Sequence, residues 1–218
     1  MKITQGNKGL RLDIRDCGLM RYREALALQL ELVEQRQKEK IANTVLILEH
    51  QPVITLGLRE SQNRLLVSED VLAERGIDLV SVKRGGGTTA HNPGQVVLYP
   101  VVSLRSLKLG VNEYVRKLEA IGIELLSGFG INAGRRKGYP GLWLGEKKFG
   151  SIGVRIKKWV TFHGMAVNIS NDLSIFETIV PCGLEGVRIT SVCGETGLDI
   201  SMSEVKETLA TLCREHFV

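Results

Sequence analysis

The sequence predicts one α/β (α+β) domain spanning residues 1–218, in which helices flank a mixed β-sheet. Two observations favour this fold class. Helical and strand-like segments are interspersed along the first part of the chain, whereas Leu142–Ile169 reads as strands joined by tight turns. In addition, 218 residues suit one large domain or at most two small ones, and no linker, repeat or low-complexity tract divides them.

The elements expected in the first half follow from periodicity and turn residues. Apolar residues recur at helical spacing in Met20–Lys38, which indicates a helix. Asn43–Glu49 and Val53–Leu56 read as strands. Pro100 indicates that the strand at Val96–Val102 is an edge strand or is kinked. The other elements expected here are a short helix capped by Ser68 and running through Glu74, a strand at Asp78–Lys83 and a helix at Asn112–Leu126.

The second half of the sequence predicts hairpins followed by a last helix. Turn signals lie at Gly145-Glu146 and Lys157-Lys158. Ser201 and Glu204 have the spacing of a capping box, so the last helix is expected to begin there and to run to His216. The strands that the turns separate are expected at Leu142–Gly145, Lys148–Ile156 and Val160–Ile169.

Composition disfavours several classes of protein. No apolar run approaches the roughly 20 residues of a membrane helix, and the charged N-terminus lacks a secretory signal, so we expect a cytoplasmic protein. The net charge of +5 could serve nucleic acid or an acidic protein partner. Because the basic residues are dispersed, aromatic residues are few and no nucleic-acid motif is present, nucleic acid is the weaker expectation.

A glycine-rich loop, RGGGTTAHNPGQ, stands at Arg84–Gln95. Such loops often bind phosphate, but no lysine follows these glycines and no G-K-[ST] sequence is present. Phosphate is therefore the weaker interpretation. We expect the loop to open the backbone for another ligand, with its glycines leaving space and its N–H groups free to donate.

The four cysteines, Cys17, Cys182, Cys193 and Cys213, form no C-x-x-C pair. Neither a zinc site nor a disulfide framework is expected, and the thiols should be reduced in the cytoplasm. Cys17 and Cys213 fit a packing role. Cys193, in SVCGETG, resembles a turn cysteine and competes with Cys182 as a candidate nucleophile.

Cys182 lies in a Pro-Gly turn, IVPCGLEG, just after a short helical piece at Asp172–Glu177. Pro181 fixes the direction of the chain, and Gly183 lets a ligand approach the backbone. The thiol is either a nucleophile or an ordinary turn cysteine. As a nucleophile it needs a cationic or basic neighbour, because the thiolate is the reactive form and a free thiol has a pKa of about 8.5.

Three side chains are candidates for that neighbour. His91 or His163 could form a cysteine–histidine pair, although His163 is equally explained as a hydrogen-bonded sheet histidine. Lys148 begins a strand that otherwise reads apolar and small. If its side chain faces a pocket, its ammonium would lower the pKa of a nearby thiol. The alternative is a solvent-facing lysine like Lys147.

Four motifs in order resemble those of the octanoyltransferases (lipoyl/octanoyl transferases) of lipoate biosynthesis. The resemblance covers roughly Val45 to Thr190 and implies the mixed-sheet fold of the biotin and lipoate protein ligases, with a catalytic core at about residues 30–213. The motifs are LILEHQPVITLG at Leu46–Gly57, RGGGTTAHNPGQVVLYP at Arg84–Pro100, the pair KFGSIGVRI at Lys148–Ile156 and FHGMAVN at Phe162–Asn168, and PCG at Pro181–Gly183.

The resemblance implies catalytic and binding roles. Cys182 would form an acyl-thioester with Lys148 as its catalytic partner, and Cys193 has no role in the family pattern. No metal or other cofactor is implied, because the donor thioester is already activated. The acyl pocket would be lined by Arg84, Gly85, Gly86, Gly87, Thr88, Thr89, Ala90, His91, Ser151, Ile152, Gly153, Gly164, Met165 and Ala166.

The implied reaction carries an octanoyl group from octanoyl-acyl carrier protein to a lysine of a lipoyl domain, the first step of endogenous protein lipoylation. The acceptors would be the lipoyl domains of 2-oxoacid dehydrogenase complexes and the glycine cleavage H protein. Lys148 would move protons in both half-reactions. A basic surface suits an acidic carrier protein. We expect a monomer with neither a nucleic-acid nor a membrane partner.

Three alternatives stay open. An ATP-dependent lipoate or biotin protein ligase on the same scaffold would use an acyl-adenylate, with the glycine loop near the phosphate. A cysteine hydrolase would pair Cys182 with His163 or His91. A non-catalytic binding protein would form no acyl-enzyme.

The chain departs from the family pattern at two positions. Ala90 stands where an aromatic residue usually precedes the loop histidine, and Asn92 stands where glycine usually follows it. Asparagine tolerates a positive φ, so the turn is expected to survive. If Ala90 faces the acyl pocket, the lost bulk affects the preferred acyl length but not the transfer chemistry.

Overall fold

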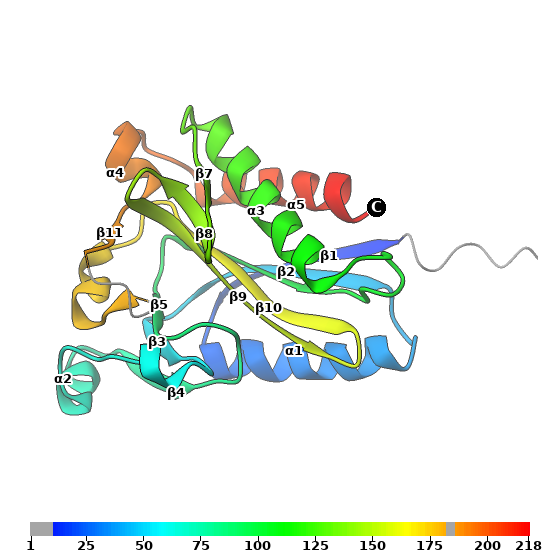
Figure 1. Ribbon diagram of the computed structural model, residues 1–218, viewed down its shortest axis with the longest axis horizontal. Helices are drawn as coiled ribbons and strands as arrows, with labels where there is room; N and C mark the ends of the chain where they lie inside the picture. Colours follow the sequence, from blue (N-terminus) through cyan, green and yellow to red (C-terminus); the bar gives the residue numbers. More distant parts are fainter. Residues whose placement is uncertain (1–10, 182–185) are drawn as a thin grey trace, which may run out of the picture.

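An eight-stranded mixed sheet forms the centre of the computed structural model, which describes residues 11–181 and 186–218 (Figure 1). β1 pairs parallel with β2, and β11 (Arg188–Ile189) pairs parallel with β9, whereas the other neighbours are antiparallel. The predicted mixed sheet is confirmed. The strand order is β1 (Leu12–Met20), β2 (Asn43–His50), β6 (Gln95–Val101), β10 (Val160–Asn168), β9 (Lys147–Lys157), β8 (Tyr139–Leu144) and β7 (Gly134–Arg136).

The central strands are buried on both faces. In β2, Val45 and Ile47 pack with α3 (Val111–Gly128) and α5 (Met202–Phe217), while Leu46 and Leu48 pack with α1 (Tyr22–Gln37). Figure 1 shows α1 on one side of the sheet and α3 with α5 on the other. Burial on both faces explains why β2 is an apolar run without polar alternation.

A second, three-stranded sheet lies beside the first, in the order β4 (Asp78–Ser81), β3 (Val53–Leu56), β5 (Thr89–His91). Its core joins Ile54 of β3 to Leu72 of α2 (Glu69–Glu74) and to Phe176 of the 3₁₀ helix η2 (Leu173–Thr178). Two short elements complete the chain, the 3₁₀ helix η1 (Glu60–Gln62) and the helix α4 (Val192–Thr196).

Most predicted elements are present, and the exceptions have local causes. Pro100 does not mark an edge, since β6 lies between β2 and β10. The β6–β10 ladder stops at the Leu98–Met165 pair, so Pro100 lies beyond the last paired residue on that side. The turn expected at Lys157-Lys158 is one residue later, at Lys158 and Trp159, with φ of 48° and 67°.

Two further expectations at element ends are corrected, and one strand was not expected. Ser68 caps α2 as predicted, accepting a hydrogen bond from the Val71 N–H, but Ser201 precedes α5 without a side-chain capping bond. The end of the glycine-rich stretch is strand β5 and not loop. Strand β1 was not expected, because its charged residues obscure the apolar pattern of an edge strand. None of the helices within the described ranges is both long and apolar enough to span a membrane.

Candidate functional site

Arg84 anchors the glycine-rich loop from inside the protein. Its side chain is only 6% exposed. The guanidinium donates to the hydroxyl and carbonyl oxygens of Thr55, at 2.6 and 2.9 Å, and to the Gly85 carbonyl at 3.1 Å. Because Thr55 belongs to β3, these bonds tie the loop to the small sheet.

Backbone contacts hold the loop on its other sides. The Leu58 N–H donates to the Arg84 carbonyl at 3.0 Å. A Cβ on Gly57 would lie 2.1 Å from the Gly86 carbonyl oxygen, and a Cβ on Gly153 would lie 2.9 Å from that of Gly85. Real Cβ atoms do not approach so closely, so the loop packs between the end of β3 and strand β9 only because both partners are glycine.

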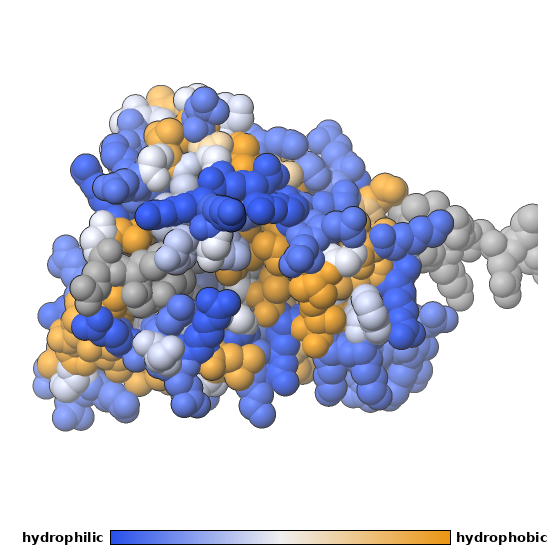
Figure 2. All heavy atoms as spheres, in the orientation of Figure 1, coloured by the Kyte–Doolittle hydropathy of each residue, from blue (hydrophilic) through white to orange (hydrophobic). Residues whose placement is uncertain are grey.

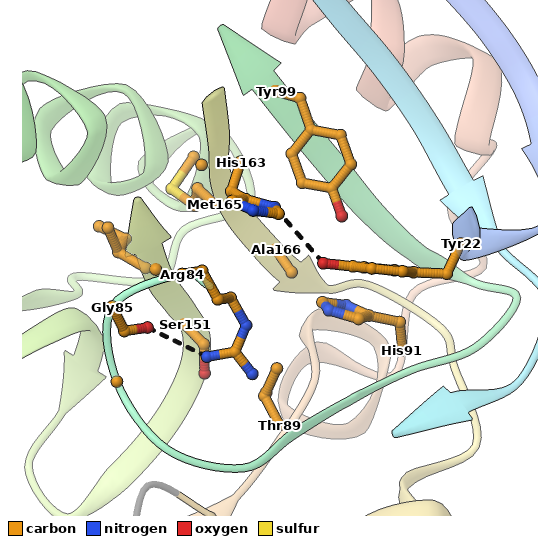
Figure 3. A pocket seen from close by; sticks show the side chains of 14 residues that line it. Tyr22, Arg84, Gly85, Thr89, His91, Tyr99, Ser151, His163, Met165 and Ala166 are labelled. Atoms are coloured by element: carbon orange, nitrogen blue, oxygen red, sulfur yellow. Dashed lines mark hydrogen bonds between the residues drawn. The ribbon is translucent and has the colours of Figure 1, made fainter. Parts of the chain in front are cut away.

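Two cavities meet at this loop. The smaller leaves about 30 Å³ and the larger about 170 Å³. Gly85, Gly86, Ile152 and Gly153 line both of them, so the two cavities adjoin where the loop meets β9. Figure 3 shows the smaller cavity, with Arg84, Gly85 and Ser151 on one side and the rings of Tyr22, His91, Tyr99 and His163 on another.

Most of the predicted pocket residues come together around the smaller cavity. Their chain segments are the loop, strand β9 and strand β10, as the family resemblance implied. The predicted residues that line it are Arg84, Gly85, Gly86, Thr89, His91, Ser151, Ile152, Gly153, Gly164, Met165 and Ala166.

Gly87, Thr88 and Ala90 line neither cavity. A Cβ on Gly87 would lie 2.4 Å from Cβ of Gln62, and the Thr88 hydroxyl accepts the Arg64 N–H at 3.0 Å. Ala90 is fully buried in the core of the small sheet. Ala90 therefore faces neither cavity, and the expected influence on acyl length has no basis in the contacts of this side chain.

Two other loop expectations need correction. The N–H groups of Gly85 and Thr88 are not free, because they donate to the carbonyls of Val154 and Gln62 at 3.0 and 3.3 Å. Asn92 does not adopt a positive φ; Gly94 does, at 87°. The Asn92 amide instead donates to the Asp172 carbonyl at 2.7 Å, which joins the loop to the segment before η2.

Lys148 is buried and lines the larger cavity, with 3% of its surface exposed. Its Nζ lies 5.2 Å from the centroid of the Trp143 ring. The interpretation of Lys148 as a solvent-facing lysine is wrong. Its neighbour Lys147 is partly exposed and pairs with Glu195 at 2.6 Å.

Of the two candidate nucleophiles, Cys182 and Cys193, the described residues include Cys193. Cys182 and Gly183 lie outside the described residues. Cys193 is half-buried in α4, where its N–H donates to the Ile169 carbonyl at 2.9 Å, and it lines neither cavity. Cys213 is on the buried face of α5, and this burial raises the pKa of its thiol to about 12. Cys17 is half-buried in β1.

Sequence reasoning missed part of a ring cluster beside the small cavity. Its members are Tyr22, His50, His91, Tyr99 and His163. Tyr22 and Tyr99 line the cavity, but in the sequence they read as apolar positions of a helix and a strand. The Tyr99 hydroxyl lies 2.8 Å from Nε2 of His50, and the Tyr22 ring stacks on His91 at 6.0 Å between centroids. No local motif distinguishes these tyrosines from core residues, so only the fold could reveal them.

The three histidines of this cluster are held neutral. Burial, followed by the Arg84 and Arg155 charges, lowers the pKa of His163 to about 3. Burial lowers the pKa of His50 to about 4 and that of His91 well below its ordinary value. Because a general base works best with a pKa near the operating pH, these imidazoles are weak candidates for activating a thiol at neutral pH.

No group of three or more histidine, cysteine, aspartate or glutamate side chains within the described ranges is arranged to hold a metal ion.

The chain matches the family described as lipoyl protein ligase A/B catalytic domain over residues 21–214. It is 38% identical to an octanoyltransferase of Maridesulfovibrio salexigens over 94% of each chain. It is also 42% identical to an octanoyltransferase of Desulfotalea psychrophila, over 93% of this chain and 92% of that one.

Solved structures of similar fold include a putative lipoate protein ligase of T. acidophilum with bound lipoic acid. Its TM-score is 0.68 at 18% identity, over 95% of this chain and 86% of that one. The biotin protein ligase of Aquifex aeolicus in complex with biotin and ATP has a TM-score of 0.56 at 14% identity, over 94% and 70%. The predicted biotin and lipoate ligase-like fold is confirmed.

The neutral histidines predict a loss of stability in mild acid. An unfolded histidine has a pKa of about 6.5, so between pH 6.5 and about 4 the unfolded chain binds protons that folded His50, His91 and His163 do not. The contribution of these histidines to the free energy of unfolding is therefore complete above pH 6.5 and decreases as the pH falls below that value. We expect the free energy of unfolding to drop by about 2 kcal/mol per histidine between pH 7 and pH 5.

Urea titrations at the two pH values measure this drop. His163→Asn removes one of the three groups and should reduce the drop by about a third. Equal stability at pH 7 and pH 5 would contradict the burial of three neutral imidazoles.

Proposed function

This chain belongs to the lipoyl protein ligase A/B catalytic domain family, and within that family we propose that it is an octanoyltransferase. It is an acyltransferase that carries the octanoyl group in protein lipoylation. The proposal in detail is transfer from octanoyl-acyl carrier protein to a lysine of a lipoyl domain, through a thioester on Cys182. The observation that carries this mechanism is the buried Lys148 in a cavity bounded by the glycine-rich loop.

The course of the chain near residue 182 supports a Cys182–Lys148 pair. Pro181, immediately before the cysteine, lines a surface groove together with Ile189. Ile189 in turn pairs with Lys148 across the β11–β9 ladder, and the Thr190 N–H donates to the Lys148 carbonyl at 3.1 Å. The segment after the cysteine is thus bonded to the strand that carries the lysine, and Pro181 lies at the same groove as that segment.

In the first half-reaction the Cys182 thiolate attacks the carbonyl carbon of the octanoyl thioester. A carbon–sulfur bond to Cys182 forms and the bond to the phosphopantetheine sulfur breaks. Lys148 takes the proton from the Cys182 thiol and gives it to the departing thiolate, so charge balances without ATP. The positive charge of Lys148 also favours the thiolate form of the cysteine.

In the second half-reaction the amine of the acceptor lysine attacks the acyl-enzyme. The carbon–nitrogen bond forms, the Cys182 thiolate leaves, and Lys148 receives the excess proton of the amine. The products are an octanoyl amide and the free enzyme. A lipoyl domain is the acceptor that this chemistry and the family imply.

A basic rim beside the larger cavity, formed by Arg59, Arg136 and Lys137, suits an acidic donor protein. Arg59 lines the cavity, and no described lining residue is acidic. Arg136 and Lys137 are exposed next to Gly138 of the lining, and the Arg136 guanidinium lies 5.0 Å from the Trp143 ring centroid. Figure 2 shows a band of strongly hydrophilic residues over β7 and β8 on this face. Complementary charge speeds the encounter of such partners.

The thioester on Cys182 is tested by intact-protein mass spectrometry after mixing the enzyme with octanoyl-acyl carrier protein in the absence of ATP. We expect one octanoyl adduct, labile to thiols, on the wild type and on Cys193→Ser, and none on Cys182→Ser. Lys148→Met, which keeps the chain length but removes the amine, should slow loading by about 100-fold or more. Adding a lipoyl domain should discharge the adduct.

Other outcomes separate the alternatives. An adduct that requires ATP on every variant would favour a ligase. Release of octanoate without an amine acceptor would favour a hydrolase. Loading of Cys182→Ser at the wild-type rate would refute Cys182 as the nucleophile.

Charge reversal in the basic rim should weaken the donor encounter. We expect Arg136→Glu combined with Lys137→Glu to raise KM for octanoyl-acyl carrier protein about 10-fold at low ionic strength, with little effect on loading from octanoyl-pantetheine. The control is Lys40→Glu, an exposed lysine beyond the far end of α1. An equal effect on both donors would show that the rim acts through the fold and not through the carrier protein.

A further inference from the structure

Tyr22 and His163 face each other at the side of the small cavity away from Arg84 and Gly85 (Figure 3). Tyr22 is the first residue of α1, and His163 lies in the middle of β10. The Tyr22 hydroxyl lies 3.4 Å from Nδ1 of His163. His91 and Tyr99 pack behind them, with the Tyr22 ring nearly parallel to that of His91 at 16°. Four rings therefore close this side of the cavity.

His163 is held in an unfavourable backbone conformation. Its φ is +55°, a left-handed value that bulky residues seldom adopt, although it still pairs with Val154 across the β9–β10 ladder. Its N–H donates to Oε1 of the fully buried Gln29 at 2.7 Å. Such strain persists only where neighbouring groups fix it, and it is concentrated at functional sites. In this chain it directs an imidazole into the cavity.

The position of this wall relative to Lys148 gives it a role. The larger cavity contains Lys148, and it adjoins the small cavity at Gly85, Gly86, Ile152 and Gly153. An acyl chain attached beside Lys148 and passing these residues would end at the rings of Tyr22 and His163. The whole small cavity offers only about 30 Å³, room for one or two water molecules, so it can take the end of an acyl chain and leaves little space for a longer one.

We propose that Tyr22 and His163 form the end wall of the acyl cavity and thereby set the length of the acyl group that the enzyme accepts. This inference rests on the proposed octanoyl transfer. The wall is polar in composition but uncharged, because burial keeps the imidazole neutral, so a terminal methyl group can rest against it without facing an ionised side chain.

The test measures acyl-enzyme formation from octanoyl-, decanoyl- and dodecanoyl-pantetheine. His163→Gly removes the imidazole and suits the positive φ. Each further buried methylene is worth about fourfold in affinity, so this variant should raise the dodecanoyl-to-octanoyl loading ratio at least 10-fold. His163→Asn also tolerates the backbone but keeps part of the side-chain volume, so it should raise the ratio by about fourfold.

Two controls separate the wall from general effects. Lys158→Gly makes the same change at another positive-φ residue, an exposed one with φ of 48° in the β9–β10 turn, and should leave the ratio unchanged. Tyr22→Phe keeps the ring and should change the ratio less than twofold. If His163→Gly fails to fold, as judged by near-ultraviolet circular dichroism, His163→Asn decides the question.

An unchanged ratio in a folded His163 variant that still loads octanoyl groups would overturn the end wall alone. A wild-type enzyme that loads none of the donors, nor octanoyl-acyl carrier protein, would overturn the proposed transfer and the wall together.

Discussion

Close packing of glycine backbones is the constraint on which the site depends. The Gly85–Gly86 segment fits between Gly57 and Gly153 because neither neighbour carries a Cβ; a Cβ at these two positions would stand 2.1 and 2.9 Å from loop carbonyl oxygens. Arg84, bonded to Thr55 beneath the loop, fixes the segment from the inside. Loop and strand β9 thus form a shared boundary between two cavities, one with the buried lysine and one with the ring cluster.

The two cavities have different chemical characters, and the difference suits a two-part ligand. The larger one offers the ammonium of Lys148 beside the Trp143 ring and opens near the basic rim, an environment for a reacting thioester and its charged carrier. The smaller one is enclosed mostly by glycines, Met165, Ala166 and uncharged rings, an environment for an alkyl chain. Its one charged group, the Arg84 guanidinium, is bonded to Thr55 and Gly85. A reactive acyl group with an apolar tail fits this division.

Most of the fold could be predicted from the sequence, because turn residues and hydrophobic periodicity are local features. The β8–β9–β10 hairpins, helix α3 and the mixed sheet follow from turn residues and periodicity, and these were predicted. Strand β1 was not, since an edge strand with one half-buried face and several charges has no apolar pattern to read. Of the two interpretations of Pro100, an edge strand or a kink, the edge is wrong, because the interruption of the β6–β10 ladder is a tertiary feature.

In the candidate site, too, tertiary contacts could not be predicted from local sequence. Lys148 and the glycine-rich loop could be found from residue type and motif, but the direction of the Lys148 side chain could not. Ala90 stood out as a departure from the family pattern, yet it packs in the small sheet, away from both cavities. Tyr22 is distant in sequence from every motif and reaches the cavity only because α1 begins beside β10. Contacts between elements far apart in the chain decide these assignments.

A crystal structure of the octanoyl-loaded enzyme would test most directly whether the two cavities form one acyl channel. The channel predicts that the acyl chain starts at Cys182, passes along the residues that line both cavities, and ends with its methyl group within about 4.5 Å of the rings of Tyr22 or His163. A chain that instead lay in the groove beside Pro181 and Ile189, with the small cavity unfilled, would contradict it.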